Sequence, residues 1–281
     1  MAKAKPMNRM AIENTSLSFE TQGMGEPVVL IHGALVADSF RPLIRQTGLS
    51  SNYRLITYDR RGYGNSGRAS DVLSIEAQAA DCRSLMDHLG VKRAHVVGHS
   101  LGGSIALPLA RWAPEVVNSL VLIEPALAVE GSAEEYRASL RGARRRYREA
   151  GAETFVEEFL NARVSGDGRE LLDREVPGAF DQAVSDAETA FEIDIAGLLD
   201  WTFLKPDARE IAQPVLLLLG RKSIALSPRF QDAYDALLSW LPHAEGRILP
   251  DVAHLMPIEN PQVVAAMIEE FFERHPIVQD S

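Results

Sequence analysis

The chain has 281 residues, of which 46% are hydrophobic, and a formal net charge of −10. This length is enough to bury a substantial core, and the negative charge argues against nucleic acids and anionic membrane surfaces as partners. The single cysteine, Cys82, excludes an intrachain disulfide and is typical of a reducing compartment.

The first part of the chain alternates between strand-like and helix-like segments. Residues 10–23 alternate polar and apolar side chains, which predicts a short antiparallel strand pair at a sheet edge. Apolar runs typical of strands buried on both faces then alternate with helical patterns. The strands are expected at 28–31, 53–59, 94–97 and 117–125, and the helices at 38–49, 71–90 and 101–113. This order predicts the α/β class, with a mostly parallel central sheet flanked by helices.

From about residue 126 to residue 208 the pattern changes, because only helical segments can be recognised. The alternation then resumes with a strand at 213–220, a helix at 227–242, a short strand at 244–250 and a closing helix at 260–275. We therefore predict a core domain formed by residues 1–125 and 209–281, with a helical cap (lid), residues 126–208, inserted after strand 6.

A basic stretch at residues 144–148 lies within the predicted cap. Such a stretch can bind an acidic ligand, but a solvated helix face is the favoured interpretation. Its expected partners are Glu134, Glu135 and Glu149.

The pentapeptide Gly98-His99-Ser100-Leu101-Gly102 lies between a predicted strand and a predicted helix. A serine in this G-x-S-x-G context is typical of a nucleophile elbow, a strained turn that exposes the serine Oγ. The glycines are needed because a side chain two residues away would collide with the neighbouring strand or helix. Ser100 is therefore the candidate nucleophile.

A serine hydroxyl needs a base to take its proton, and the chain has seven histidines. His254 lies in a loop between the last short strand and the last helix, at the sheet edge where a base can reach Ser100. His99 is expected to pack in the core, and His32 is expected to shape its own loop. His254 is therefore the candidate base.

The base needs a carboxylate to fix its tautomer and stabilise its charged form. The most common position for this acid follows the strand at 213–220, where this chain has Ser223 and no carboxylate nearby. Glu124, at the end of the preceding strand, reaches the same edge of the sheet and is the candidate acid. Asp251, three residues before His254, is a weaker alternative.

Acyl transfer also needs donors for the tetrahedral oxyanion. The backbone N–H of Leu101, directly after the nucleophile, is one candidate. The loop after the strand at 28–31 contains His32-Gly33-Ala34-Leu35, and the N–H of Ala34 is the other.

Five segments together resemble the α/β-hydrolase fold family, and the resemblance covers nearly the whole chain. They are HGAL at 32–35, DRRGYGNSG at 59–67, GHSLGG at 98–103, LIEP at 122–125 and DVAHLMPIENP at 251–261. In that family an insertion after the sixth strand is a lid, and some members carry the acid after this strand, as Glu124 would be. The resemblance implies an esterase, a lactonase or a similar hydrolase.

We expect a serine hydrolase that cleaves a small, hydrophobic carboxylic ester or lactone through an acyl-enzyme. Alternatives are a sensor on the same fold with slow or no turnover, a perhydrolase, an acyltransferase or a C–C hydrolase. No cofactor is expected, and no metal, because no His/Cys/Asp cluster has ligand spacing. Aromatic residues of the cap either line an apolar pocket or form its core; they are Tyr136, Tyr147, Phe155, Phe159, Phe180, Phe191, Trp201 and Phe203.

No apolar run approaches the length of a membrane span, and residues 1–16 lack the apolar segment of a secretion signal. We therefore expect a cytoplasmic protein, a monomer or homodimer, whose partner is a small-molecule substrate and neither nucleic acid nor membrane.

Overall fold

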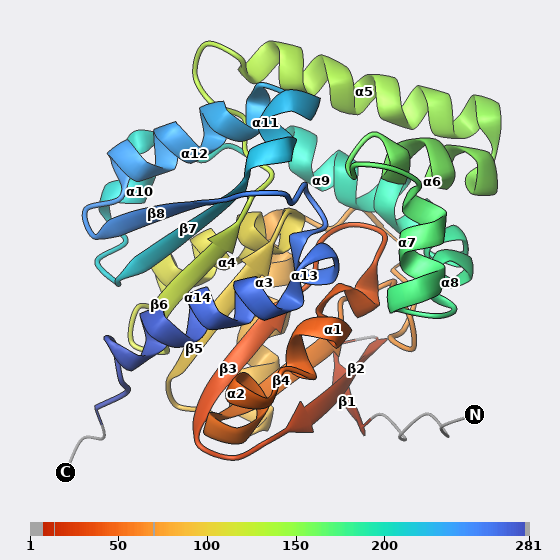
Figure 1. Cartoon of the computed structure of the whole chain (residues 1–281). Helices are drawn as coiled ribbons and strands as arrows, with labels where there is room; N and C mark the ends of the chain where they lie inside the picture. The colour runs from red at the N-terminus through yellow and green to blue at the C-terminus, as the bar shows by residue number, and fades with distance from the viewer. Residues whose placement is uncertain (1–7, 14, 70, 279–281) are drawn as a thin grey trace.

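The computed structural model describes residues 8–13, 15–69 and 71–278, so residues 1–7 of the segment tested for a secretion signal lie outside it. Within these ranges the strands form one eight-stranded sheet in the order β1-β2-β4-β3-β5-β6-β7-β8 (Figure 1). The strands are β1 (Asn8–Ile12), β2 (Thr15–Gln22), β3 (Glu26–Ile31), β4 (Tyr53–Asp59), β5 (Ala94–His99), β6 (Val117–Ile123), β7 (Val215–Gly220) and β8 (Ala244–Leu249).

The sheet is antiparallel only at its N-terminal edge. β1 pairs antiparallel with β2, and β2 pairs antiparallel with β4. All pairings from β4 through β3, β5, β6 and β7 to β8 are parallel. This confirms the predicted edge pair and the predicted mostly parallel sheet. The six parallel strands therefore end at one common edge, where loops far apart in the sequence meet.

Alternate side chains of the buried strands belong to different hydrophobic clusters, as the period of two in a strand requires. Val29 and Ile31 of β3 pack on one face, with α3 (Ile75–His88), α4 (Leu101–Trp112) and α12 (Arg229–Trp240). Val28 and Leu30 pack on the other face, with three further helices. These are α1 (Arg41–Ile44), α2 (Thr47–Asn52) and α14 (Pro261–Glu273), which lie in front of the sheet in Figure 1.

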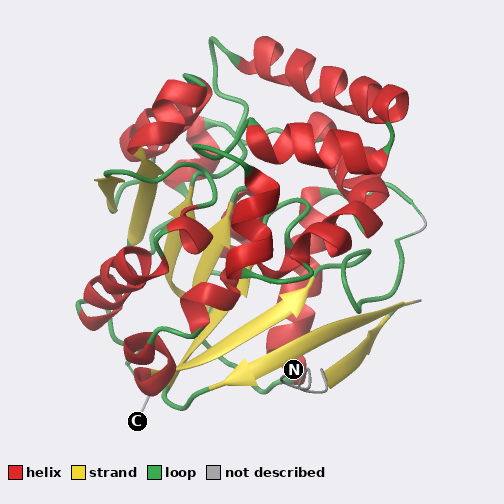
Figure 2. Ribbon diagram, turned by 45° about the vertical axis from the view of Figure 1, so that its right-hand side comes forward, coloured by secondary structure: helices red, strands yellow, loops and turns green. Residues whose placement is uncertain are grey.

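Between β6 and β7 the described chain contains helices and no strand, as predicted. They lie beyond the end of the sheet to which the parallel strands point (Figures 1 and 2). The segments are α5 (Ala133–Ala150), α6 (Ala152–Asn161), α7 (Gly168–Glu175), α8 (Ala179–Ser185), the π-helical η2 (Thr189–Asp194), α9 (Ile195–Asp200) and α10 (Lys205–Arg209). We call residues 126–208 the insertion. Its action as a lid stays a prediction. No helix of the described residues is long and apolar enough to span a membrane.

The insertion has its own hydrophobic cluster, which includes Phe155, Phe180 and Phe191. The same cluster contains Leu35 from the loop after β3 and Leu255 from the loop after β8. The insertion is therefore packed directly onto two loops at the common edge of the sheet.

Two local expectations differ from the structure. The segment after β7, expected to be a loop, forms α11 (Arg221–Leu226), since its residues have good helix propensity and nothing in it breaks a helix. The expected helix at 38–49 is divided into the 3₁₀ turn η1 (Ala37–Phe40), α1 and α2. α13 (Met256–Glu259) is a further short helix before α14.

The basic stretch of α5 is ion-paired, as predicted, but with different partners. Arg144 and Arg148 pair with Glu192 of η2, and Arg146 pairs with Glu158 of α6. Glu134 instead pairs with Arg141. These contacts join α5 to its neighbours within the insertion.

The close approach of α4 to β3 yields a test of the fold. A Cβ added to Gly102 would overlap the backbone carbonyl of Ile31 and lie 2.8 Å from that of His32. Gly102→Ala is therefore expected to lower the free energy of unfolding by about 3 kcal/mol, measured by chemical denaturation.

The matched control is Gly142→Ala in α5, where an added Cβ meets no atom within 4 Å. This change should raise the free energy of unfolding by about 0.5–1 kcal/mol, because alanine favours a helix over glycine. Equal effects of the two substitutions would contradict the close approach at Gly102.

Candidate active site

Ser100 lies in a strained turn between β5 and α4. Its backbone has φ 53° and ψ −119°, a conformation that non-glycine residues rarely adopt. The turn is held by hydrogen bonds from the end of β6: the Ser100 N–H donates to the Ile123 carbonyl at 2.8 Å, and the Ala126 N–H donates to the Ser100 carbonyl at 3.1 Å. The structure therefore contains the sharp strand-to-helix turn that the pentapeptide predicts.

The Ser100 side chain faces a cavity of about 650 Å³ between the edge of the sheet and the insertion. Ala34, Leu101 and His254 line the same cavity. Most other lining residues are apolar, and four of them belong to the aromatic set singled out in the insertion: Tyr136, Phe155, Phe159 and Phe191. The other members of that set lie outside the cavity lining: Tyr147, Phe180, Trp201 and Phe203.

His254 and Glu124 form a buried pair, each only 4% exposed. The His254 Nδ1–H donates to Glu124 Oε2 at 2.7 Å. The other carboxylate oxygen, Oε1, accepts the Gly220 N–H at 2.7 Å, which fixes the orientation of the carboxylate. Because Nδ1 carries the proton, Nε2 of His254 has the free lone pair that a general base needs.

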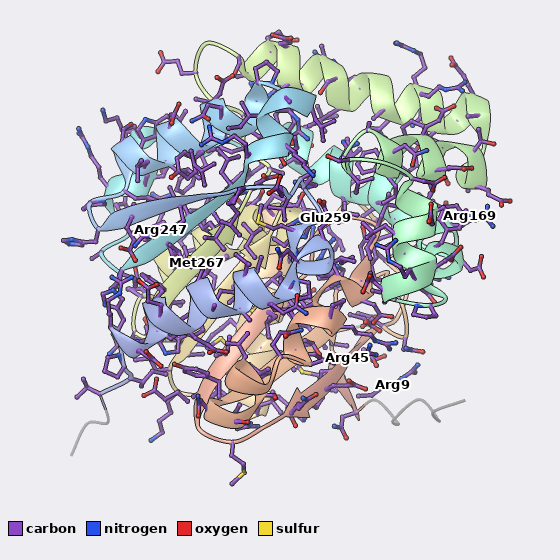
Figure 3. All side chains as sticks on the ribbon, in the orientation of Figure 1. Arg9, Arg45, Arg169, Arg247, Glu259 and Met267 are labelled. Carbon is purple, nitrogen blue, oxygen red and sulfur yellow. The ribbon has the colours of Figure 1, made fainter. Side chains whose placement is uncertain are left out.

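The backbone around His254 is fixed from three sides. Its N–H donates to the Arg163 carbonyl of the insertion at 3.0 Å, and its carbonyl accepts Nε2–H of His99 at 2.8 Å. The carboxylate of Glu259, labelled in Figure 3, accepts the N–H groups of Ala253 and Leu255, at 2.8 and 3.1 Å. His99, expected only to pack, thus also supports the candidate base.

No hydrogen bond joins Ser100 to His254 within the part of the chain that the structure describes. Both side chains line one cavity, however, and contacts between a nucleophile and its base are often long until substrate binds. The structure thus places Ser100, His254 and Glu124 around one site at the edge of the sheet.

The two candidate oxyanion donors flank Ser100. Leu101 is the first residue of α4, so its N–H has no acceptor within the helix. Ala34 lies on the loop after β3, next to Leu35, which has a φ of 68°. Among the described residues, neither N–H donates to another group of the protein. Two free donors therefore border the cavity beside Ser100.

His32 has a structural role, as expected. Its Nδ1–H donates to the Gly33 carbonyl at 2.7 Å, and its Nε2 accepts the Arg60 N–H at 3.0 Å. One ring nitrogen thus contacts the loop that carries the Ala34 amide, and the other joins this loop to Arg60 after β4.

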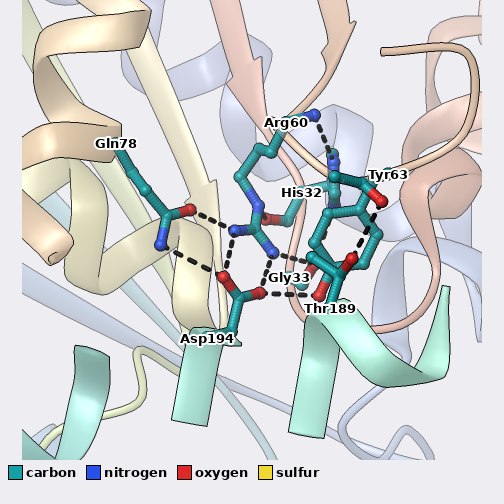
Figure 4. A network of polar contacts seen from close by, with 8 residues as sticks. His32, Gly33, Arg60, Tyr63, Gln78, Thr189 and Asp194 are labelled. Carbon is teal, nitrogen blue, oxygen red and sulfur yellow. Dashed lines mark hydrogen bonds and ion pairs between the residues drawn. The ribbon is translucent and has the colours of Figure 1, made fainter. Parts of the chain in front are cut away.

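A buried network around Arg60 connects this loop to the insertion (Figure 4). The Arg60 guanidinium donates to the carbonyls of His32 and Gly33, at 3.2 and 3.0 Å. It also forms an ion pair with Asp194 of η2 at 2.8 Å, and the two side chains are 2% and 1% exposed. Tyr63 and Gln78 donate to the same carboxylate, at 2.6 and 3.1 Å. The insertion is therefore connected through one arginine to the loop after β3, which carries Ala34.

Removal of one partner from a buried ion pair leaves the other charge buried and uncompensated. Arg60→Met should therefore lower the free energy of unfolding by about 3–5 kcal/mol, as measured by chemical denaturation. The control Arg83→Met removes ion pairs with Asp87 and Glu115 on the surface, and a loss of only about 0–1 kcal/mol is expected. Losses of similar size would contradict the importance of the buried pair.

Burial shifts the pKa values of the candidate triad. It raises the pKa of Glu124 to about 7, although the Gly220 N–H opposes this shift. Burial, followed by the positive charges of Arg229 and Arg163, holds the pKa of His254 well below its ordinary value. Burial also lowers the pKa of His99 to about 3, so this side chain stays neutral. The form expected to be active, with neutral His254 and ionised Glu124, is therefore lost as the pH falls.

The pH dependence tests these interactions. The charged or titratable side chains that affect His254 are Glu124, His99, Arg163 and Arg229. Arg229→Met removes a positive charge that lowers the pKa of both His254 and Glu124, so both values rise. The acid limb of kcat/KM for a neutral ester should therefore move to higher pH. A shift to lower pH, or the same shift in Arg146→Met, would contradict this.

Asp251, the alternative acid, and Ser223, at the usual position of the acid, have no recorded contact with His254 among the described residues. Asp251 is exposed, and its backbone φ of 60° marks a turn. Ser223 is fully buried in α11. In the described residues no group of three His, Cys, Asp or Glu side chains is arranged to hold a metal ion.

The sequence profile of the alpha/beta hydrolase fold family matches residues 26–261. This chain belongs to the α/β-hydrolase fold family. It is 30% identical over 270 residues to the putative non-heme bromoperoxidase BpoC of Mycobacterium tuberculosis, covering 92% of this chain and 97% of that protein. It is 26% identical over 254 residues to carboxylesterase YbfK of Bacillus subtilis, covering 87% and 79% of the two chains.

Another match is local. The chain is 39% identical over 111 residues to the putative carbamate hydrolase RutD of Azorhizobium caulinodans, which is 39% of this chain and 41% of that protein. The chain thus covers less than two thirds of this relative. Among solved structures, a thermophilic esterase from Thermogutta terrifontis has a TM-score of 0.77 at 24% identity, covering 97% of this chain and 100% of that one.

Proposed function

We propose that the protein is a serine hydrolase that cleaves carboxylic esters or lactones through an acyl-enzyme. The observation that supports this most is the 2.7 Å hydrogen bond between His254 and Glu124, since His254 lines the same cavity as Ser100 in its strained turn. A neutral imidazole held by a carboxylate is the arrangement that activates a serine hydroxyl.

In the proposed first step, Ser100 Oγ attacks the acyl carbon while His254 Nε2 accepts the hydroxyl proton. The carbonyl oxygen becomes an oxyanion, which the N–H groups of Ala34 and Leu101 stabilise. The His254 proton then passes to the leaving oxygen as its bond to the acyl carbon breaks. This leaves an ester on Ser100 and releases an alcohol, or opens the ring of a lactone.

In the second step water replaces the serine hydroxyl as the nucleophile. His254 takes a proton from the water, the oxyanion forms again at the same two amides, and the proton returns to Ser100 Oγ. The products are the free carboxylic acid and the original enzyme. Glu124 stabilises the charged imidazole in both steps without itself accepting a proton.

Family membership and the names of relatives support ester hydrolysis. The B. subtilis relative is a carboxylesterase by name, and the similar T. terrifontis structure is that of a thermophilic esterase. The predominantly apolar lining of the cavity, including Phe155 and Phe191, suits a substrate with a hydrophobic part.

Pre-steady-state hydrolysis of p-nitrophenyl acetate tests this proposal. The wild type should release a burst of nitrophenolate followed by steady turnover, because an acyl-enzyme accumulates. Ser100→Ala should lose both phases. Glu124→Gln should lower kcat by about 10⁴-fold, because a misoriented imidazole no longer serves as the base. Asp251→Asn is the matched control and should retain wild-type turnover.

Binding of the ester without a burst or turnover would favour a sensor over an enzyme. An active Glu124→Gln variant together with an inactive Asp251→Asn variant would overturn the assignment of the acid.

A further inference from the structure

Two arginines border the catalytic cavity directly beside His254. Arg163 follows α6, and its carbonyl accepts the His254 N–H at 3.0 Å. Arg229 is the first residue of α12, and its guanidinium lies 4.2 Å from the ring centre of Phe230. The Phe230 ring lies 4.9 Å from that of His254. The backbone of Arg163 thus contacts the backbone of His254, and the Phe230 ring lies between Arg229 and the His254 ring.

Neither of these arginines forms an ion pair with a carboxylate of the described residues. The Arg163 guanidinium donates to the Phe159 carbonyl at 2.8 Å and covers the Phe159 ring at 3.2 Å. Arg229 lies over the rings of Phe230 and Tyr136, the latter at 5.2 Å. By contrast Arg146, which lines the same cavity, is paired with Glu158.

The carboxylates in and beside the cavity do not pair with Arg163 or Arg229. Asp194 is paired with Arg60, Glu158 is paired with Arg146, and Glu124 is hydrogen-bonded to His254. Glu135 and Asp232 line the cavity but are exposed, and neither lies within ion-pair distance of Arg163 or Arg229. Burial, and then the neighbouring charge of Arg229, lower the pKa of Arg163 well below its ordinary value. Arg163 and Arg229 therefore lie in a part of the cavity where no carboxylate of the described residues compensates their charge.

We propose that Arg163 and Arg229 bind the carboxylate of a substrate that is both an acid and an ester or lactone. This inference rests on the proposed function and names the substrate class of the same site. A guanidinium matches a carboxylate through two parallel N–H donors, and such a pair is stronger away from bulk water. The aromatic rings beneath both guanidinium groups hold them in place and leave their outer N–H groups to meet an anion.

The positions of the two arginines also indicate where the two groups of the substrate would lie. The carboxylate would lie next to His254, so the reacting ester group and the anionic group are separated by a short chain of carbon atoms. A cavity of about 650 Å³ holds such a molecule together with the aromatic wall of the insertion. Hydrolysis of this substrate would yield a product with one further carboxylate.

Matched substrates test the proposal. Specificity constants are measured for mono-4-nitrophenyl glutarate and for 4-nitrophenyl methyl glutarate, in which the carboxylate is a neutral methyl ester, after subtraction of the uncatalysed rates. The wild type should prefer the acid by about tenfold or more, and added salt should reduce this preference. In the double variant Arg163→Met, Arg229→Met the ratio of the two constants should fall by at least about tenfold, since methionine keeps the packing and loses the charge.

Arg146→Met is the matched control, because this arginine lines the cavity but is already paired with Glu158. It should retain the wild-type ratio. Equal specificity constants in the wild type, or a ratio that the double variant leaves unchanged, would overturn the carboxylate site, and the arginines would then only pack against the aromatic rings.

Binding to Ser100→Ala separates this inference from the proposed function. Calorimetric titration with monomethyl glutarate and with dimethyl glutarate needs no turnover. Tighter binding of the monoester, lost in the triple variant that also carries the two methionines, supports the site even if the wild type hydrolyses neither nitrophenyl ester. Hydrolysis of both esters at equal rates, with equal binding, leaves the hydrolase in place and overturns the carboxylate site.

Discussion

The backbone of Ser100 is held in a left-handed conformation by hydrogen bonds that come from the end of the neighbouring strand. Ile123 accepts its N–H, and Ala126 donates to its carbonyl, so the turn after β5 cannot relax without the loss of contacts to β6. Glu124, the residue directly after β6, also has a positive φ, at 44°, and carries the carboxylate that holds His254. One pair of adjacent parallel strands therefore positions both the candidate nucleophile and the candidate acid, and the strain stored there is compensated by the surrounding sheet.

The insertion contacts the candidate active site at two points. Asp194 holds Arg60, which in turn holds the carbonyls that precede the Ala34 amide, while the carbonyl of Arg163 holds the N–H of His254. The loop that carries Ala34 and the candidate base His254 are thus both supported by residues between β6 and β7. This arrangement also brings Arg163 close to the base, where together with Arg229 it lowers the pKa of His254. An anion bound to these arginines would offset that effect, so substrate charge and the basicity of His254 are linked.

Much of the fold and of the site could be predicted from local patterns. The alternation of strands and helices, the G-x-S-x-G turn and the loop positions of His254 and Glu124 are set by short-range chemistry, and the structure places these residues at one edge. The contacts that support the site correspond to no local pattern in the sequence. Arg60 and Asp194 are 134 positions apart, and nothing in either neighbourhood indicates that they pair. Glu192 was missed as the partner of α5 for the same reason. His99 was expected to pack, but its Nε2–H donates to the His254 carbonyl. This contact depends on how β5 is placed relative to the loop after β8, which the local sequence does not indicate.

The proposed hydrolysis requires Ser100, His254 and two backbone amides to converge on one reacting carbon. The most direct measurement is a crystal structure of the protein after reaction with a fluorophosphonate, a mimic of the tetrahedral intermediate. We predict that phosphorus is bonded to Ser100 Oγ and that the phosphoryl oxygen lies about 3 Å from the nitrogens of Ala34 and Leu101. His254 Nε2 should lie within hydrogen-bond distance of the adduct. An adduct on another residue, or a phosphoryl oxygen turned away from both amides, would contradict it.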